Sequence, residues 1–334
     1  MRTLVTGGGG FLGAVLVRQL LARGDAVTLV ARGRYPALEA LGARGVQIDL
    51  GAPGAGLSEV AAGHDVVFHV AAKAGVWGPD EEFTAINVGG TLNVIRACQE
   101  AGVGRLVYTS SPSVVFAGGD HENANQDLPY PASYDAPYPR TKAEAERAVL
   151  AANSPGLVTT ALRPHLIYGP GEPHMIPRLR DRHQKGRLRI IGNGKNKVSL
   201  CYVDNAAVAH LQAADRLTAS APHAGKAWFV NDSEPVLLWE WVNALFRELG
   251  EPPLTRSVSP GVALLGAHVA SGIWSLFSLA GEPPITPFAV KSLSTSHWYD
   301  IQPANQAFGY VPLVDGAEGF ARTVAAFRAE SASV

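Results

Sequence analysis

The stretch TGGGGFLG at residues 6–13 decides the fold. It stands between an expected buried strand over residues 3–6 and an expected helix that begins near Phe11 and carries Leu12 on its apolar face. The spacing differs by one residue from the G-x-G-x-x-G pattern, but the physics is shared. Gly7 permits a tight turn, Gly10 lets the backbone approach a pyrophosphate, and Gly13 lets the helix press against the strand. The helix N-terminus offers free N–H groups to the phosphates, so the stretch predicts a dinucleotide site.

The end of the second expected strand, residues 26–31, indicates which dinucleotide binds. An acidic residue usually stands there and accepts a hydrogen bond from the adenosine ribose of NAD. This chain has Ala31 instead, followed by Arg32 and Arg34. No carboxylate repels a 2′-phosphate, and guanidinium groups bind phosphate bidentately. The pattern favours NADP(H), with NAD(H) as the alternative if both arginines are solvated surface charges.

Other strand ends supply further candidate cofactor contacts. We expect Asp49, after the third strand, to meet the adenine amine, and small residues after the fourth strand to pass under the cofactor. The segment that ends the sixth strand would place backbone groups beside the nicotinamide carboxamide. The cofactor-binding candidates from these strand ends are Asp49, Leu50, Ala71, Ala72, Lys73, Pro164 and Ile167.

Strand and helix patterns alternate along the first half of the chain. Strands are expected near 3–6, 26–31, 46–48, 65–70, 104–109 and 157–163, and the longest helices near 83–102 and 134–153. This alternation predicts an α/β fold, a doubly wound parallel sheet of the Rossmann type. We expect a dinucleotide-binding domain over residues 1–165. A smaller, mostly helical substrate lobe should follow over residues 166–330, with a strand near 227–230 returning to the sheet.

Bulk properties exclude several classes of protein. The 334 residues carry a net charge of −1, so no basic excess suggests nucleic-acid binding. Cys98 and Cys201 give neither a disulfide framework nor a metal-ligand spacing, and no metal site is expected. A strand begins almost at the first residue, so no signal peptide is expected. These features favour a cytoplasmic protein.

One long segment, residues 257–281, contains no Asp, Glu, Lys or Arg. We expect an apolar helix that lines a hydrophobic pocket. The alternative is peripheral contact with a membrane. The glycines, serines and alanines of the segment argue against a helix that spans the bilayer.

Tyr138 and Lys142 are four residues apart on an expected helix and so share one of its faces. A tyrosine has a pKa near 10, and a neighbouring ammonium would lower it toward the range useful for acid–base catalysis. The fifth strand ends in hydroxyl residues, of which Ser111, or else Ser110, would hold a substrate oxygen. Asn87 is expected to be a structural amide rather than a ligand of an ordered water.

In this order along the chain, these motifs resemble the extended short-chain dehydrogenase/reductases, specifically their 3β-hydroxysteroid dehydrogenase branch. The phrases YTSS (108–111), APYP (136–139) and ALRP (161–164) carry the branch. AAKAGVWG (71–78) and SHWY (296–299) are most similar to bacterial 2-alkyl-3-oxoalkanoate reductases, which are NADPH-dependent. The same phrases also resemble bacterial sterol C4-demethylation dehydrogenases. The resemblance implies that Tyr138 exchanges the proton, Lys142 anchors the nicotinamide ribose and Ser111 binds the substrate oxygen. It also implies that Gly7, Gly10, Phe11 and Leu12 frame the pyrophosphate of the cofactor.

The resemblance implies reduction of the 3-keto group of a long-chain 2-alkyl-3-oxo acid, a small hydrophobic carboxylic acid. Lys73, His165 and His174 are candidates to hold its carboxylate, although His165 could equally serve packing. The alternative is decarboxylating oxidation of a 3β-hydroxysterol that bears a 4-carboxylate.

Two further functions fit the sequence less well. Sugar-nucleotide epimerases usually carry an arginine four residues before the tyrosine of the Y-V-D motif, and Val198 stands there. A nucleotide-sensing regulator would typically lack the tyrosine or the lysine. Relatives commonly dimerise through the helices expected near 83–102 and 134–153, so a homodimer is expected.

Overall fold

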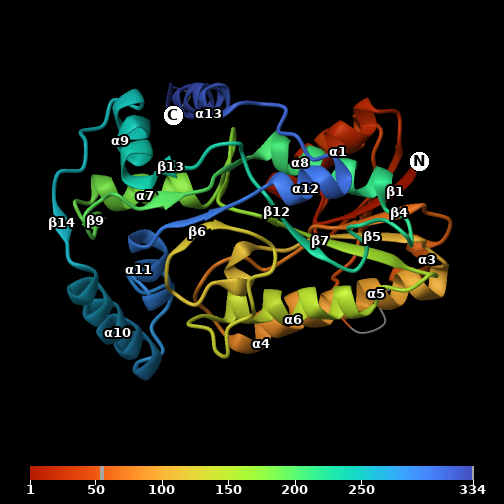
Figure 1. Ribbon diagram of the computed structural model, residues 1–334, viewed down its shortest axis with the longest axis horizontal. Helices are drawn as coiled ribbons and strands as arrows, with labels where there is room; N and C mark the ends of the chain where they lie inside the picture. The colour runs from red at the N-terminus through yellow and green to blue at the C-terminus, as the bar shows by residue number, and fades with distance from the viewer. Residues whose placement is uncertain (53–55, 333–334) are drawn as a thin grey trace.

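A computed structural model describes residues 1–52 and 56–332. Its centre is a sheet of seven parallel strands in the order β12-β7-β5-β4-β1-β2-β3 (Figure 1). The order runs outward from β1 in both directions, so the chain reverses its path between β1 and β4, the crevice where doubly wound sheets bind ligands. The strands are β1 (Arg2–Thr6), β2 (Ala26–Ala31), β3 (Arg44–Gln47), β4 (Val66–His69), β5 (Arg105–Thr109), β7 (Val158–Pro164) and β12 (Ala227–Val230).

Helices cover both faces of this sheet, which confirms the predicted fold class (Figure 1). One face carries α1 (Phe11–Ala22), α8 (Val203–Arg216) and α12 (Gln302–Phe308). The other carries α3 (Leu57–Ala61), α5 (Gly90–Ala101) and α6 (Pro137–Ala151), together with α4 (Asp80–Phe83) and the π-helical turn η1 (Thr84–Gly89). The short helices α2 (Pro36–Glu39) and η2 (Pro112–Val115) follow β2 and β5.

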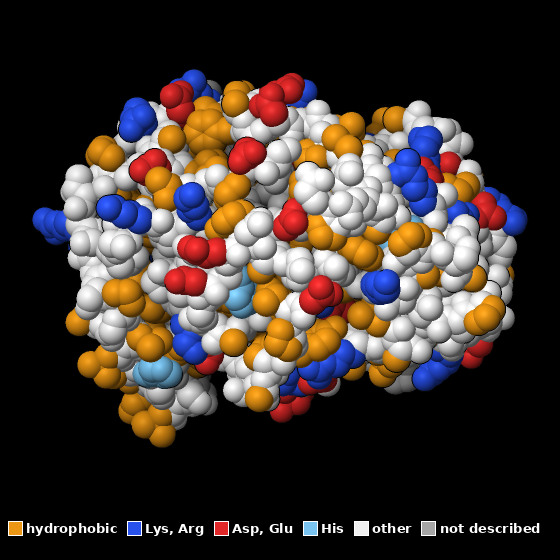
Figure 2. Space-filling view, in the orientation of Figure 1, with side chains coloured by type: hydrophobic (Ala, Val, Ile, Leu, Met, Phe, Trp, Pro, Cys, Tyr) orange, Lys and Arg blue, Asp and Glu red, His pale blue; other side chains and the backbone are white. Residues whose placement is uncertain are grey.

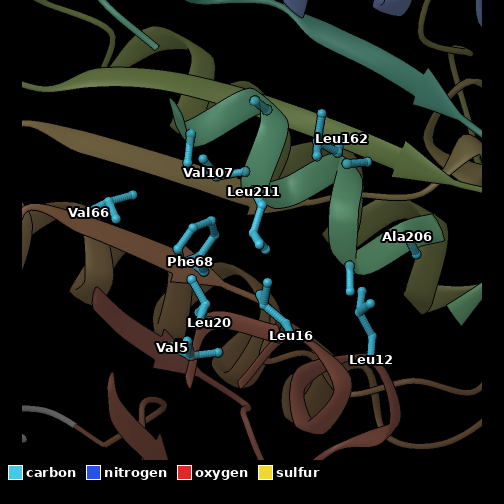
Figure 3. Packing of buried hydrophobic residues seen from close by; sticks show 14 of the residues in the cluster. Val5, Leu12, Leu16, Leu20, Val66, Phe68, Val107, Leu162, Ala206 and Leu211 are labelled. Atoms are coloured by element: carbon cyan, nitrogen blue, oxygen red, sulfur yellow. The ribbon is translucent and has the colours of Figure 1, made fainter. Parts of the chain in front are cut away.

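The apolar face of α1 locks the glycine-rich turn onto the sheet. Leu12, Leu16 and Leu20 are buried, and they pack toward Phe68 of β4 and Leu211 of α8 (Figure 3). Their spacing of four residues places them on one face of the helix, as the sequence pattern predicted. Burial of each leucine contributes about 1.5–3 kcal/mol, so the helix N-terminus is held rigidly at the edge of β1.

Beyond residue 165 the chain builds a lobe of helices and short strands. Its helices are α7 (Met175–Gln184), α9 (Leu238–Glu248), α10 (Pro260–Leu276), α11 (Pro287–Ser294) and α13 (Gly316–Ala332). A four-stranded sheet has the order β13 (Val236–Leu237), β10 (Lys197–Val198), β15 (His297–Tyr299) and β6 (His121–Ala124). Two-stranded pairs join β8 (Ile167–Tyr168) with β11 (Cys201–Tyr202) and β9 (Ile190–Ile191) with β14 (Ser257–Val258).

Both sides of residue 165 contribute to both large sheets. β12 pairs with β7 in the central sheet, and β6 pairs with β15 in the smaller one. The pairing of β6 with β15 attaches the lobe to the segment that follows β5. The domain boundary at residue 165 stays a prediction.

The expectation that residues 257–281 line a pocket is wrong. None of them lines the main cavity, and α10 projects from one end of the molecule, where hydrophobic side chains gather (Figures 1 and 2). Leu265 and Leu276 are 67 % and 77 % exposed, while the buried Ala263 and Ala267 mark the opposite face. The sequence shows only that the segment lacks charge, whereas the side of the helix that is covered depends on how α10 packs against α11. Among residues 1–52 and 56–332, no helix is both long and apolar enough to cross a membrane.

Candidate active site

A cavity of about 790 Å³ lies at the carboxyl ends of the central strands. It extends from the glycine-rich turn, past the ends of β2, β4, β5 and β7, to the lobe formed by α7, α9 and α11. Most of the candidate residues from the sequence line this one cavity: Gly7, Gly10, Phe11, Leu12, Arg32, Asp49, Leu50, Ala71, Ala72, Lys73, Ser111, Tyr138, Lys142, Pro164 and Ile167.

The glycine-rich turn has the geometry of a pyrophosphate cradle. Gly7 has a φ of +69°, and a Cβ there would lie 2.6 Å from the backbone of Ala71. A Cβ on Gly13 would lie 2.2 Å from the carbonyl oxygen of Gly7. Gly10 caps α1 without any side-chain hydrogen bond, so the first N–H groups of the helix are left for a ligand. The residues present therefore fit a dinucleotide.

Tyr35 belongs to this cradle and was missed in the sequence. Its ring occupies the space that a side chain on Gly9 would need, because a Cβ there would lie 1.9 Å from the ring. Tyr35 also lines the cavity. The four consecutive glycines hid this requirement, since only the folded turn shows which of them faces an aromatic ring.

At the adenosine end, only one of the two candidate arginines lines the cavity. Arg32 is exposed there, whereas Arg34 forms an ion pair with Glu39 at 2.9 Å. Asp49 accepts a hydrogen bond from the N–H of Gly51 at 3.0 Å. Arg32 is thus the side chain available to a 2′-phosphate.

Lys142, one helical turn after Tyr138 on α6, is held by the end of β5. It is 2 % exposed, its Nζ donates to the carbonyl of Thr109 at 2.6 Å, and it lies 4.2 Å from the centre of the Tyr108 ring. Burial lowers the pKa of Lys142 to about 7, and the carboxylate of Glu146 opposes that shift. The ammonium is therefore close to losing its proton at neutral pH.

The pKa of Tyr138 moves in the direction opposite to the one expected. Burial raises the pKa of the phenol, and hydrogen bonding with Ser111 only partly opposes it. The expectation that the lysine lowers this pKa was wrong for the protein by itself, because desolvation of the phenolate dominates and the hydrogen bond with Ser111 is what opposes it. A phenol that keeps its proton at neutral pH is suited to donate one to a substrate oxygen.

Two serine hydroxyls stand beside Tyr138. The Oγ of Ser111 accepts hydrogen bonds from the N–H and hydroxyl of Ser113 at 3.2 and 2.9 Å, and it caps η2. The Oγ of Ser110 is buried without a partner among the described residues, and both serines line the cavity. Ser111 is therefore positioned by its neighbours, and Ser110 has a free hydroxyl.

A buried amide supports the floor of the cavity. Asn87 accepts from the N–H of Lys73 at 2.7 Å and donates to the carbonyl of Lys73 and to Thr141. It therefore has the structural role expected. The ammonium of Lys73 forms an ion pair with Glu82, which leaves it poorly placed for a substrate carboxylate.

A buried ion pair fixes α6 relative to β7. The guanidinium of Arg163 donates to both carboxylate oxygens of Glu146 at 2.9 and 2.7 Å, and Tyr130 donates to the same carboxylate at 2.5 Å. Glu146 lies one helical turn beyond Lys142, so this network holds the part of α6 that carries Lys142 against β7. The signal in the sequence is that Arg163 is the one charged residue of β7.

The far wall of the cavity is apolar with imidazole groups in it. Leu179, Val242, Phe288 and Leu293 come from α7, α9 and α11, as befits a hydrophobic substrate. His165 and His297 lie in the same wall. The position of His297 in this wall could not be predicted from the sequence, because β15 lies more than a hundred residues after β7.

A glycine cradle that opens into the same cavity as Ser111, Tyr138 and Lys142 is consistent with a nicotinamide-dinucleotide-dependent oxidoreductase. The sequence profile of the 3-beta hydroxysteroid dehydrogenase/isomerase family matches residues 4–258. The chain belongs to this family, whose members act on hydroxyl or keto groups with NAD(P).

Curated relatives match nearly the whole chain. A 2-alkyl-3-oxoalkanoate reductase of Stenotrophomonas maltophilia is 47 % identical, with 96 % of this chain and 98 % of the relative covered. One from Shewanella oneidensis is 43 % identical, covering 95 % and 84 %. The human sterol-4-alpha-carboxylate 3-dehydrogenase, decarboxylating, is 37 % identical, covering 98 % and 88 %.

Solved structures show the same architecture. MoeE5 in complex with UDP-glucose and NAD is 26 % identical, with a TM-score of 0.74 over 99 % of this chain and 100 % of that chain. The structure of gox2253 has a TM-score of 0.79 at 24 % identity, covering 98 % of each chain. Both neighbours share the Rossmann fold, and the MoeE5 structure contains NAD.

Proposed function

We propose that this protein reduces the 3-keto group of a long-chain 2-alkyl-3-oxo acid to the 3-hydroxy acid with NADP(H). The observation that carries the proposal is the single cavity that joins the dinucleotide cradle and Tyr138 to an apolar wall from α7, α9 and α11. The names of two relatives more than 40 % identical to the chain support the same substrate class.

The protein's residues would divide the chemistry as follows. When bound, the nicotinamide supplies the hydride that becomes the C3–H bond. Tyr138 donates its phenolic proton to the keto oxygen, which becomes the hydroxyl, and Ser111 donates a hydrogen bond to that oxygen. Lys142, between the Thr109 carbonyl and the cavity, would hold the nicotinamide ribose. The raised pKa of Tyr138 favours the reductive direction, in which the phenol acts as an acid.

The choice of NADP(H) rests on the rim of the cavity. β2 ends in Ala31, without a carboxylate, and Arg32 is exposed beside it. A guanidinium binds a ribose 2′-phosphate well, whereas an acid would be needed to favour the free hydroxyl. Measuring turnover with NADPH and NADH on a purified 2-alkyl-3-oxo acid tests both parts of the proposal. Failure to oxidise either cofactor with any such acid would refute it.

The second candidate is oxidation of a 3β-hydroxysterol with a 4-carboxylate. It is favoured by the 37 % identity to the human sterol dehydrogenase, and its substrate also carries a carboxyl group next to the reacting carbon. NAD⁺ reduction with a 4-carboxysterol, and no reaction with a 2-alkyl-3-oxo acid, would identify this function.

A sugar-nucleotide substrate has less support. Two of the three arginines of α7 form ion pairs, Arg178 with Glu282 and Arg180 with Glu251. Val198 is buried in β10 and brings no charge to a diphosphate. The epimerases among the structural neighbours share the fold, and fold alone does not carry function.

We also propose that α10 contacts a lipid surface. Its exposed side chains form an uncharged apolar face, and α11, which packs against it, lines the cavity with Phe288 and Leu293. A long-chain substrate dissolved in a membrane could thus reach the cavity beside α10. Single exposed apolar residues are normal on a protein surface, whereas a group of them on one face marks an interaction site.

A homodimer through α5 and α6 is the remaining proposal. The resemblance supports it, and Leu92 of α5 is exposed. Light scattering of the wild type and of Leu92→Glu tests it: a dimer that dissociates in the variant would support the interface, and a monomeric wild type would overturn it.

A further inference from the structure

Two imidazole rings meet in the cavity wall that faces the catalytic residues. His165 follows β7, and His297 begins β15. Their ring centres are 4.7 Å apart, and both rings line the cavity. These residues are 132 positions apart in the sequence, so only the fold brings them together.

The hydrogen bonds fix which ring nitrogens carry protons. Nδ1 of His165 lies 2.6 Å from the carbonyl oxygen of Ser199, and Nε2 of His297 lies 2.6 Å from that of Ser292. A carbonyl oxygen only accepts, so each of these nitrogens donates an N–H. In the neutral rings the other nitrogens, Nε2 of His165 and Nδ1 of His297, therefore present lone pairs.

One of these lone pairs lacks a partner. Nδ1 of His297 is buried and has no hydrogen bond within the described residues, although the side chain is only 3 % exposed. Buried polar atoms in native proteins are nearly always satisfied, and exceptions often mark a functional site. The ring needs either a donor or a proton, and a protonated ring would in turn need an anion.

The sheet register places this pair next to the reacting group. Thr109 of β5 pairs with Leu162 of β7. Ser111 and His165 follow these partners by two and three residues, just beyond the ends of adjacent strands, and adjacent strands lie about 4.8 Å apart. In a 3-oxo acid the carboxyl carbon and the keto carbon are separated by one carbon atom. One substrate can therefore reach both Ser111 and His165.

We propose that His165 and His297 form a carboxylate subsite that takes up one proton from solvent when the substrate binds and donates N–H hydrogen bonds to the carboxylate. No covalent bond changes at this subsite. The inference rests on the proposed function and deepens it, because it states how the enzyme distinguishes a 3-oxo acid from the neutral ketone or ester. His297 is then a specificity-determining residue.

The surroundings keep both rings neutral until an anion arrives. Burial and the neighbouring His297 hold the pKa of His165 well below its usual value. Burial also lowers the pKa of His297. His121, on the neighbouring strand, lowers the pKa of both rings further, whereas the carboxylate of Asp120 partly raises the pKa of His297. The Tyr299 phenol packs 5.6 Å from His165, and burial raises its pKa, so it stays neutral.

The other carboxylate candidates are already engaged or exposed to solvent. Lys73 is paired with Glu82, and His174 is exposed at the start of α7. Glu172, the buried acid that lines the cavity, accepts hydrogen bonds from three backbone N–H groups of residues 174–176. Its charge is thus stabilised locally.

The test uses variants that keep the structural hydrogen bonds. In His165→Asn the amide nitrogen can replace Nδ1 toward Ser199, and in His297→Gln it can replace Nε2 toward Ser292. Both remove the second ring nitrogen. His268→Asn, on the exposed side of α10 and outside the cavity, is the matched control. Each protein is titrated with a long-chain 2-alkyl-3-hydroxy acid and with its methyl ester by calorimetry in two buffers, and turnover of the matching 3-oxo compounds is measured.

We expect the wild type and His268→Asn to prefer the acid, to take up close to one proton on binding it, and to bind it more weakly as the pH rises. Losing a charge-assisted hydrogen bond should weaken acid binding in each cavity variant by about 10- to 100-fold, with ester binding unchanged and proton uptake lost. Equal acid and ester affinity in the wild type, or an unchanged ratio in both variants, would overturn the subsite while leaving reductase activity intact. A wild type that neither binds nor reduces any of these acids would overturn the proposed function and the subsite together.

Discussion

Replacing Lys142 by methionine should make the stability of the protein depend less on pH. The lysine has a pKa of 10.5 in an unfolded chain and about 7 in the folded protein, where burial penalises its charge. Below about pH 7 both states are charged, and the folded state bears the full cost of the buried ammonium. Between these two pKa values the unfolded chain keeps a proton that the folded protein has released, so the stability of the wild type rises by about 1.36 kcal/mol per pH unit.

The magnitude follows from that slope. The free energy of unfolding of Lys142→Met minus that of the wild type should fall by about 2–3 kcal/mol between pH 7 and pH 9. Loss of the hydrogen bond to Thr109 adds a constant that does not change with pH. Urea denaturation of both proteins, without nicotinamide cofactor, measures the difference at each pH. The matched control is Lys195→Met, an exposed lysine, which should follow the wild type. Parallel pH curves for Lys142→Met and the wild type would refute the argument that burial displaces this pKa.

Three further predictions concern the cofactor and α10. Arg32→Gln should raise the Kd for NADPH about 10- to 100-fold and leave that for NADH nearly unchanged, since one charge-assisted phosphate contact is lost; equal effects on both cofactors would count against the 2′-phosphate role. Gly13→Val should abolish cofactor binding in fluorescence titrations, because its Cβ would lie 2.2 Å from the carbonyl oxygen of Gly7, whereas Gly104→Ala, with nothing within 4 Å, should bind normally. Leu265→Ser combined with Leu276→Ser should weaken sedimentation with phosphatidylcholine vesicles at least several-fold, because burying each leucine contributes about 1.5–3 kcal/mol; unchanged sedimentation would remove α10 from the lipid contact.

The parts of the molecule that the sequence predicted are those with local physical causes. The turn at Gly7, the start of α1 at Phe11 and the helix that carries Tyr138 and Lys142 depend on contacts within one βαβ unit or one helical turn. The same holds for the central strands, whose apolar runs lie between glycine and polar turns. Residues that end parallel strands meet at one edge, so the cavity lining could also be anticipated.

The parts that the sequence did not predict depend on tertiary packing. His297 reaches His165 only because β15 joins β6 and β10 in the second sheet. The exposed face of α10 follows from where α11 packs, and a lack of charge is equally compatible with a pocket wall. The predicted direction of the Tyr138 pKa shift was wrong, because residue spacing does not show how deeply the phenol is buried.

The most direct test of the central claim measures hydride and proton transfer together. Purified wild-type protein is mixed with NADPH and a long-chain 2-alkyl-3-oxo acid, and the loss of NADPH absorbance is compared with the 3-hydroxy acid formed, beside Tyr138→Phe, which keeps the ring but lacks the proton. The wild type should convert one acid per NADPH, and Tyr138→Phe should bind NADPH with similar affinity yet lose nearly all turnover. Product formation by Tyr138→Phe at the wild-type rate would contradict the role of the phenol, and no product from the wild type would contradict the reductase itself.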